Sequence, residues 1–160
     1  MKINLAYFGT PDFSARLLEK VITTSDLPVD LKLAVTQPDK PVGRKQTLTP
    51  SPVKEVAKKY GIEVWDYNLK DQKLKSKNEE SSLIKNLKQK EIDLVLLYAY
   101  GEIIEQELLD TPRYGFWNIH PSLLPKYRGA SPITYPIILG DAETGVTLMK
   151  MDEKLEHDLS

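Results

Sequence analysis

The sequence predicts an α/β fold, with a mostly parallel sheet and flanking helices, on three observations. The chain opens with an apolar strand, a glycine turn, a helix and a second strand. Such a β-α-β unit favours parallel strands joined by right-handed crossovers. Residues 92–99 are almost entirely apolar, as in a strand covered on both faces. A short apolar strand at 116–119 stops at Pro121, which has no N–H for a ladder. The three observations together therefore favour an open, mostly parallel α/β sheet.

The other elements follow from periodicity and turn residues. Apolar runs predict strands at 3–8, 31–36, 62–65, 92–99, 116–119 and 145–151, with 92–99 at the sheet's centre. Helical spacing predicts helices at 14–22, 52–60, 83–90 and 102–109. We expect Ser131 to cap a last helix that has Pro132 at its first position and Gly140 as its stop, with a disturbance at Pro136. Residues 37–52 are expected to be irregular because they are rich in proline, and residues 66–82 to form a loop or frayed helix.

Length and composition indicate one soluble domain. The 160 residues are 41% hydrophobic and 28% charged, with a formal net charge of −1, which is ordinary for such a domain. The chain has no cysteine, so disulfides and thiolate metal sites are excluded and a reducing compartment fits. No run approaches the ~20 apolar residues of a membrane span, and the run at 3–8 is too short for a signal peptide. We expect a cytoplasmic monomer that does not bind membranes.

Two polar side chains mark the end of the strand at 116–119. Asn118 and His120 are two residues apart, so in a strand they point to the same side. The Asn118 amide and a protonated His120 would both donate to a carbonyl oxygen that becomes an oxyanion, and removing such a donor costs roughly 3–4 kcal/mol. The alternative is that Asn118 caps a turn and His120 is a hydrogen-bonded core imidazole.

The loop after this pair is suited to a ligand. Ser122-Leu123-Leu124-Pro125 is stiffened by prolines on both sides, and Lys126, Tyr127 and Arg128 add polar and charged groups. In open α/β sheets, ligands bind at loops that follow the strands. The N-terminal turn lacks the G-x-G-x-x-G pattern of dinucleotide binders, so a nicotinamide or flavin cofactor is not supported.

A second candidate surface is basic. Between residues 37 and 59, six cations and two acids leave +4 on a chain of net −1. A basic loop beside a strand end suits a phosphate backbone, most usefully that of RNA. An ordinary solvated loop with surface lysines is the alternative. The cations are Lys40, Arg44, Lys45, Lys54, Lys58 and Lys59, and the acids are Asp39 and Glu55.

Four separated segments resemble the methionyl-tRNA formyltransferases, a branch of the folate-dependent formyltransferases. They are FGTPDF at 8–13, TQPDKPVGR at 36–44, PSPVK at 50–54 and NIHPSLLPKYRG at 118–129, and Tyr100-Gly101 and Gly145-Val146-Thr147 fit as well. The segment at 118–129 alone indicates only the wider group, which includes glycinamide ribonucleotide and sugar-nucleotide enzymes. The two proline-rich segments favour the tRNA branch.

The resemblance implies a Rossmann-like catalytic domain that moves a formyl group from 10-formyltetrahydrofolate to the amino group of methionyl initiator tRNA, without a metal. Asn118 and His120 match the family's catalytic residues. Contacts with folate are implied for Ser122, Leu123, Leu124, Pro125, Tyr100 and Gly101. Contacts with tRNA are implied for Arg44, and for its neighbours Lys40 and Lys45.

The C-terminal end departs from the family pattern, which is Met-Asp-x-Gly-Leu-Asp-x-Gly. Glu156 stands at the position of the catalytic aspartate, and Lys154 replaces a glycine. The extra methylene of Glu156 would displace its carboxylate by about an ångström, which can cost about a hundredfold in rate. We also expect residues 1–160 to be a truncated catalytic domain, without the family's C-terminal β-barrel. Two alternatives follow: an impaired fragment that binds folate or tRNA without turnover, and a sugar-nucleotide formyltransferase.

Overall fold

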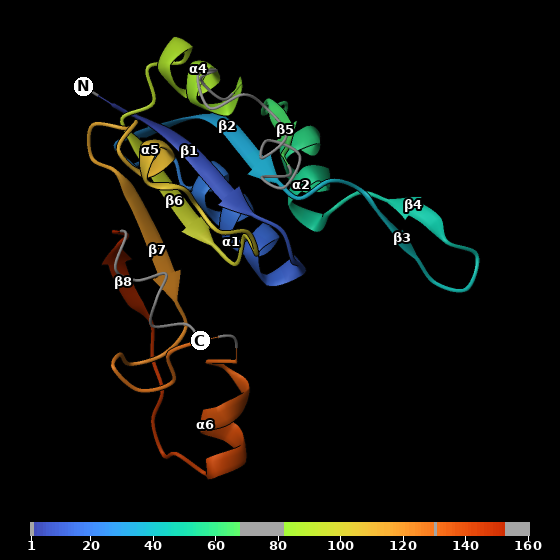
Figure 1. Ribbon diagram of the computed structural model, residues 1–160, viewed down its shortest axis with the longest axis vertical. Coiled ribbons are helices and arrows are strands. Elements are labelled where there is room, and N and C mark those ends of the chain that lie inside the picture. Colours follow the sequence, from blue (N-terminus) through green and yellow to red (C-terminus); the bar gives the residue numbers. More distant parts are fainter. Residues whose placement is uncertain (1, 68–81, 130, 153–160) are drawn as a thin grey trace.

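The computed structural model of the chain describes residues 2–67, 82–129 and 131–152, and its centre is a six-stranded sheet (Figure 1). The strand order is β5-β2-β1-β6-β7-β8. Neighbouring strands are parallel except for β8, which runs antiparallel to β7. The mostly parallel sheet is thus confirmed. The strands are β1 (Ile3–Gly9), β2 (Val29–Thr36), β5 (Val64–Asp66), β6 (Leu94–Tyr98), β7 (Phe116–His120) and β8 (Thr147–Lys150).

Helices cover both faces of the sheet. The core on one face includes residues of α1 (Asp12–Thr23) and α2 (Pro52–Lys59), and the core on the other includes residues of α4 (Ser82–Gln89) and α5 (Gln106–Leu109). β1 and β6 are the two central strands, which confirms the central position expected for residues 92–99. None of the described helices is long and apolar enough to cross a membrane.

Side-chain alternation on β1 shows how the two cores divide. Phe8 belongs to the core beneath α4 and α5, whereas Tyr7 belongs to the core beneath α1 and α2. The Phe8 ring makes edge contacts with Tyr100 and with Phe116 of β7, at 5.3 Å between ring centroids in both cases. Aromatic pairs of this kind contribute about 0.5–1.5 kcal/mol each beyond area burial. They hold β7, the strand with the candidate site, against the sheet's centre.

The prediction of an irregular segment at 37–52 was wrong. This segment contains an antiparallel hairpin of β3 (Lys40–Val42) and β4 (Thr47–Thr49), which projects from the sheet (Figure 1). Pro41 pairs with Leu48 within it. A two-stranded ribbon tolerates proline because each strand has a second, unpaired side, to which a position without an N–H can be assigned.

The last helix, α6 (Thr134–Leu139), begins later than expected. Ser131 does not cap it: the N-cap position is Ile133, which makes no side-chain capping bond. Pro136 does not disturb the helix, because it lies in the first turn, where an amide has no intrahelical partner. Gly140 ends the helix in the left-handed conformation at φ 71°, as predicted.

For residues 66–82, Asp66 ends β5 and Ser82 begins α4. Residues 68–81, which carry most of that predicted loop, lie outside the described residues.

Candidate active site

β7 places Asn118 and His120 together at the carboxyl end of the sheet. Both are half-buried, and their spacing in a regular strand puts them on one face. Asn118 lies between Leu97 of β6 and Met149 of β8, while His120 lies opposite Thr147. No described residue hydrogen-bonds the Asn118 side chain. Its amide is therefore free to donate to a ligand.

His120 is held by the loop that follows it. Its Nε2 lies 2.9 Å from the backbone oxygen of Tyr127. A carbonyl oxygen only accepts, so Nε2 carries the proton and donates. In the neutral ring the other nitrogen, Nδ1, is then an unprotonated acceptor, and it donates only when the ring is charged. The predicted oxyanion contact therefore requires the imidazolium form.

Tyr127 adopts an uncommon backbone conformation to make this contact. Its φ is 58°, in the left-handed region that costs a non-glycine residue on the order of 1–2 kcal/mol. Such conformations persist where surrounding contacts hold them. The carbonyl on His120 is one such contact, and the side chain, described below, supplies another.

Two hydroxyl groups organise the loop between His120 and Tyr127. Ser122 is fully buried and donates to the Lys126 oxygen at 2.7 Å. Thr147 of β8 donates to the Ser122 oxygen at 2.7 Å and accepts from the Leu124 amide at 3.2 Å. The Ser122 side chain thus links two positions within the loop. Thr147 links the loop to β8, the edge strand of the sheet.

The predicted folate-contacting residues of this loop differ in exposure. Leu123 is 49% exposed, Leu124 is half-buried and Pro125 is exposed. The Leu123 side chain lies against Gly145, where an added Cβ would come within 2.5 Å of Leu123 Cδ2. Because Gly145 has no side chain, Leu123 can lie beside the start of β8.

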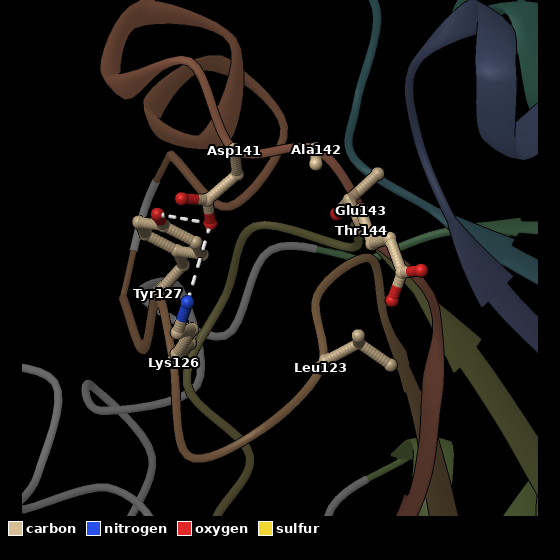
Figure 2. A pocket seen from close by; sticks show the side chains of 7 residues that line it. All are labelled: Leu123, Lys126, Tyr127, Asp141, Ala142, Glu143 and Thr144. Atoms are coloured by element: carbon tan, nitrogen blue, oxygen red, sulfur yellow. Dashed lines mark hydrogen bonds and ion pairs between the residues drawn. The ribbon is translucent and has the colours of Figure 1, made fainter.

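A pocket of about 430 Å³ adjoins this loop (Figure 2). Tyr127 Oη donates to Asp141 Oδ2 at 2.6 Å, and Lys126 Nζ lies 3.5 Å from the same oxygen. The hydrogen bond from Tyr127, helped by the Lys126 charge, lowers the pKa of Asp141, and the same bond raises the pKa of Tyr127. Tyr127 therefore joins His120, through its carbonyl, to the wall of a pocket. The lining residues are Leu123, Lys126, Tyr127, Asp141, Ala142, Glu143 and Thr144.

The other two predicted folate residues lie after β6. Tyr100 is 1% exposed, donates its hydroxyl to the Tyr67 oxygen at 2.9 Å, and has a pKa raised by burial. Its side chain is therefore a core element. Gly101 has φ +85° and accepts from Gln37 Nε2 at 3.1 Å. An added Cβ there would lie 2.6 Å from that nitrogen.

The predicted tRNA-contacting cations lie on the β3–β4 hairpin. Arg44 and Lys45 are exposed in its turn, and Lys40 at its base contacts the side-chain oxygen of Gln37. Lys54, counted above among the basic residues, has another role: Nζ lies 2.6 Å from both Asp39 and Asp66. Those bonds raise the pKa of Lys54. Its charge is neutralised inside the protein.

One predicted site residue cannot be placed, and several contacts of the site were not predicted from the sequence. Glu156 is outside the described residues. Sequence reasoning missed Asp141 and Thr147, because pairings across 14 and 25 residues leave no local pattern. It also missed the contact of His120 with Tyr127, because a backbone oxygen has no residue signature. Within the described part of the chain, no group of three or more His, Cys, Asp or Glu residues could hold a metal ion.

Comparison with known proteins gives a consistent result. The family model described as Formyl transferase matches residues 1–158. Two methionyl-tRNA formyltransferases, from Caldicellulosiruptor saccharolyticus and Agathobacter rectalis, are each 44% identical over 96% of the chain. The glycinamide ribonucleotide transformylase 1 of Geobacillus kaustophilus is similar in structure, with a TM-score of 0.75 and 29% identity over 96% of the chain.

The match covers only part of these relatives. The chain spans about half the length of the curated relatives, 47% and 46% respectively. It spans 76% of the Geobacillus kaustophilus structure and 72% of a phosphoribosylglycinamide formyltransferase from Bacillus halodurans, to which it is 28% identical with a TM-score of 0.71.

Proposed function

The chain belongs to the formyl transferase family, and from that premise we propose that it transfers a formyl group from 10-formyltetrahydrofolate to the amino group of methionyl initiator tRNA. The observation that carries the proposal is the pair Asn118 and His120, side by side on β7 at the carboxyl end of the sheet. The identity to two enzymes named for methionyl-tRNA supports this acceptor.

The pair fits the charge changes of formyl transfer. The acceptor amine attacks the formyl carbon, a new C–N bond forms, and the carbonyl oxygen becomes an oxyanion. The C–N bond to the folate nitrogen then breaks, and the proton lost by the amine balances the one gained by the leaving nitrogen. Asn118 donates to the oxyanion, and His120 donates through Nδ1 when its ring is charged.

The loop after β7 offers an apolar surface beside this pair for the folate co-substrate. Leu123 packs against Gly145 on one side and is 49% exposed on the rest of its surface, so an aromatic ring system can lie on it. The buried Ser122 hydroxyl keeps the loop in place through Lys126. These residues therefore fit an apolar, flat ligand, and they supply its position rather than its chemistry.

The hairpin supplies a separate contact for the acceptor. Arg44 and Lys45 are exposed at its turn, on a segment that follows the carboxyl end of β2. Phosphate contacts position nucleic acids without reading their sequence. We assign initiator tRNA to this surface and, because the chain has no cysteine and its acceptor is a charged tRNA, we place the reaction in the cytoplasm.

A second candidate function is binding without turnover. It is supported by Lys154 and Glu156, which depart from the family pattern. A domain with an altered acid would still hold folate through the loop at 121–125. It would differ from the transferase in rate and not in affinity.

The test is formyl transfer by the purified chain, with 10-formyltetrahydrofolate and methionyl initiator tRNA as substrates. Asn118→Ala should lower kcat by about 10² to 10³. The matched control is Asn4→Ala, which removes an amide from β1 at the opposite end of the sheet, where the side chain donates to the Glu91 oxygen. We expect that variant to keep its activity.

Binding of 5-formyltetrahydrofolate, followed by thermal shift, separates the two candidates. A ligand that binds only the folded chain adds about 2.7 kcal/mol of stability at a hundredfold excess over Kd. Binding with transfer supports the enzyme. Binding without transfer supports the second candidate, and restoring Glu156→Asp in a chain extended to family length should then recover the activity of a merely damaged enzyme. A folded chain that neither binds 5-formyltetrahydrofolate nor transfers the formyl group would contradict both candidate functions.

A further inference from the structure

Tyr127 is held by hydrogen bonds at both its backbone and its side chain. Its backbone oxygen accepts from His120 Nε2 at 2.9 Å, and its hydroxyl donates to Asp141 Oδ2 at 2.6 Å. Its φ of 58° lies in the left-handed region, which a bulky residue disfavours and which persists where other contacts hold it. Of the described residues, only Asp141 hydrogen-bonds the Tyr127 side chain. The direction of the Tyr127 carbonyl therefore depends on Asp141.

Asp141 is fixed in turn by the end of α6. Gly140 ends this helix in the left-handed conformation, and the Asp141 amide donates to the Pro136 oxygen at 2.9 Å. In Figure 2 the Asp141 carboxylate faces both Tyr127 and Lys126. The hydrogen bond from Tyr127, with the Lys126 charge, lowers the pKa of Asp141, so the group is ionised at neutral pH and is a strong acceptor. The side-chain anchor of Tyr127 thus comes from outside the loop at 121–129.

The other bonds of the loop do not reach the Tyr127 carbonyl. Ser122 Oγ donates to the Lys126 oxygen, and Thr147 Oγ1 bonds to backbone atoms of residues 122 and 124. These bonds fix the path of the loop up to residue 126, and none of them involves an atom of Tyr127. The Asp141 contact therefore has a separate effect, on the peptide that follows Tyr127.

We propose that Asp141 is a positioning residue for His120, which acts through the side chain and the carbonyl of Tyr127. Asp141 touches no reacting group: it keeps the carbonyl on Nε2, so that Nδ1 is the nitrogen that meets the substrate. The inference rests on the proposed function, but the state of the His120 ring can be observed without any reaction.

The test compares Asp141→Ala, which removes the acceptor, with Asp141→Asn, which keeps an acceptor oxygen and removes the charge. Tyr127→Phe removes the donor, and it is made alone and together with Asp141→Ala. Two quantities are measured in each variant: the imidazole ¹⁵N signals of His120 at a pH where the ring is neutral, and kcat and KM for formyl transfer.

The matched control is Glu19→Ala. Glu19 accepts from Tyr60 Oη and from Lys59 Nζ, both at 2.8 Å. This is the same combination of tyrosine, lysine and carboxylate, but it joins α1 to the end of α2. We expect Glu19→Ala to match the parent in both the ¹⁵N signals and kcat.

The parent and Asp141→Asn should show a protonated Nε2, whereas Asp141→Ala and Tyr127→Phe should show a mixture of tautomers. In Asp141→Ala, kcat should fall by about tenfold to a hundredfold, because a displacement of about an ångström can cost a hundredfold in rate. KM for 10-formyltetrahydrofolate should not change. The double variant should lose no more activity than either single variant, since both changes break one contact.

Unchanged ¹⁵N signals in Asp141→Ala would overturn the proposal, and so would changed signals with the kcat of the parent. Equal losses in Asp141→Asn and Asp141→Ala would also overturn it, because the charge and not the hydrogen bond would then matter. Losses that add in the double variant would show that Asp141 does not act through Tyr127. If the parent transfers no formyl group, the proposed function fails, and the ¹⁵N signals alone then decide whether Asp141 positions the ring.

Discussion

The backbone oxygen of Tyr127 determines which nitrogen of His120 is available for chemistry. Because the oxygen accepts from Nε2 at 2.9 Å, the proton of the neutral ring is on Nε2 and the lone pair is on Nδ1. An imidazole in this state takes a proton, whereas the charged ring gives one. The same contact therefore suits a group that changes from base to acid in one reaction cycle.

This tautomer can be observed directly. The chain has only two histidines, His120 and His157, so ¹⁵N spectra of the imidazoles are simple to assign with a His120→Gln variant. At a pH where the ring is neutral, we expect the His120 signals of a protonated Nε2 and an unprotonated Nδ1. The opposite tautomer would show that the Tyr127 oxygen does not hold the ring in solution.

The Tyr127 side chain predicts a dependence of stability on pH. The hydrogen bond from Tyr127 lowers the pKa of Asp141 in the folded chain. A carboxyl group with a lowered folded pKa stabilises the fold above its unfolded pKa, and that contribution is lost as the pH falls through the folded pKa. Tyr127→Phe should therefore be less stable than the parent at neutral pH, with a difference that shrinks on the acid side, below the ordinary carboxyl range.

Urea unfolding at neutral and acid pH measures this difference. Tyr114→Phe is the matched control, since Tyr114 is 42% exposed and no described residue hydrogen-bonds its hydroxyl. That variant should match the parent at every pH. If the difference in unfolding free energy between Tyr127→Phe and the parent stays constant at acid pH, the effect comes from packing and not from the hydrogen bond to Asp141.

At the scale of elements, Lys54 fixes the hairpin to the sheet. Ser51 caps α2 by accepting from the Lys54 amide at 3.1 Å, and the Lys54 side chain then reaches Asp39 before β3 and Asp66 at the end of β5. Lys54 is 9% exposed. Because α2, β5 and the chain entering β3 meet at this ammonium group, its removal loosens all three.

Lys54→Met should destabilise the chain by about 1–3 kcal/mol, since two partly buried carboxylates lose their partner. The lower part of that range is expected, because the Asp39 and Asp66 side chains are 26% and 37% exposed and remain hydrated. The raised pKa of Lys54 also predicts how this contribution depends on pH. The stabilisation by Lys54 is complete below the ordinary lysine pKa, and it is lost as the pH rises through the pKa of Lys54 in the folded chain. Urea unfolding checks both, with the exposed Lys58→Met of the same helix as control.

The strand at 116–119 and the hairpin show where sequence reasoning succeeded and where it failed. The long periodic elements and the strand at 116–119 follow from apolar spacing, as does the placement of Asn118 and His120 on one face. The hairpin was missed because four prolines suggested irregular structure, although proline fits the open side of a ribbon. The contacts of Lys54 with two aspartates and of Tyr127 with Asp141 were not predictable, since tertiary packing brings these partners together. The contact of His120 was not predictable because its partner is a backbone oxygen, which has no residue signature.

At the scale of the whole molecule, the basic hairpin and the pair Asn118 and His120 lie at the carboxyl ends of two different strands, on the same edge of the sheet. β2 leads into the hairpin and β7 into the loop at 121–129, and both strands run parallel toward that edge. The chain's net charge is −1, but residues 37–50 have three cations and one acid, a balance of +2. Under the proposed function, an extended acceptor such as tRNA would be held at the hairpin while its end reaches β7. A change at one place should leave the other intact.

This separation can be tested by salt dependence. In the double variant Arg44→Ala and Lys45→Ala, the slope of the logarithm of tRNA affinity against the logarithm of salt concentration should fall by about 2, since each phosphate contact contributes about 1. Binding of 5-formyltetrahydrofolate should not change. The control removes the same charge elsewhere, with Lys20→Ala on α1 and Lys85→Ala on α4, both exposed, and should keep the parent slope. If the slope falls equally in both double variants, tRNA binding depends on net charge alone. The hairpin would then have no specific role in binding tRNA.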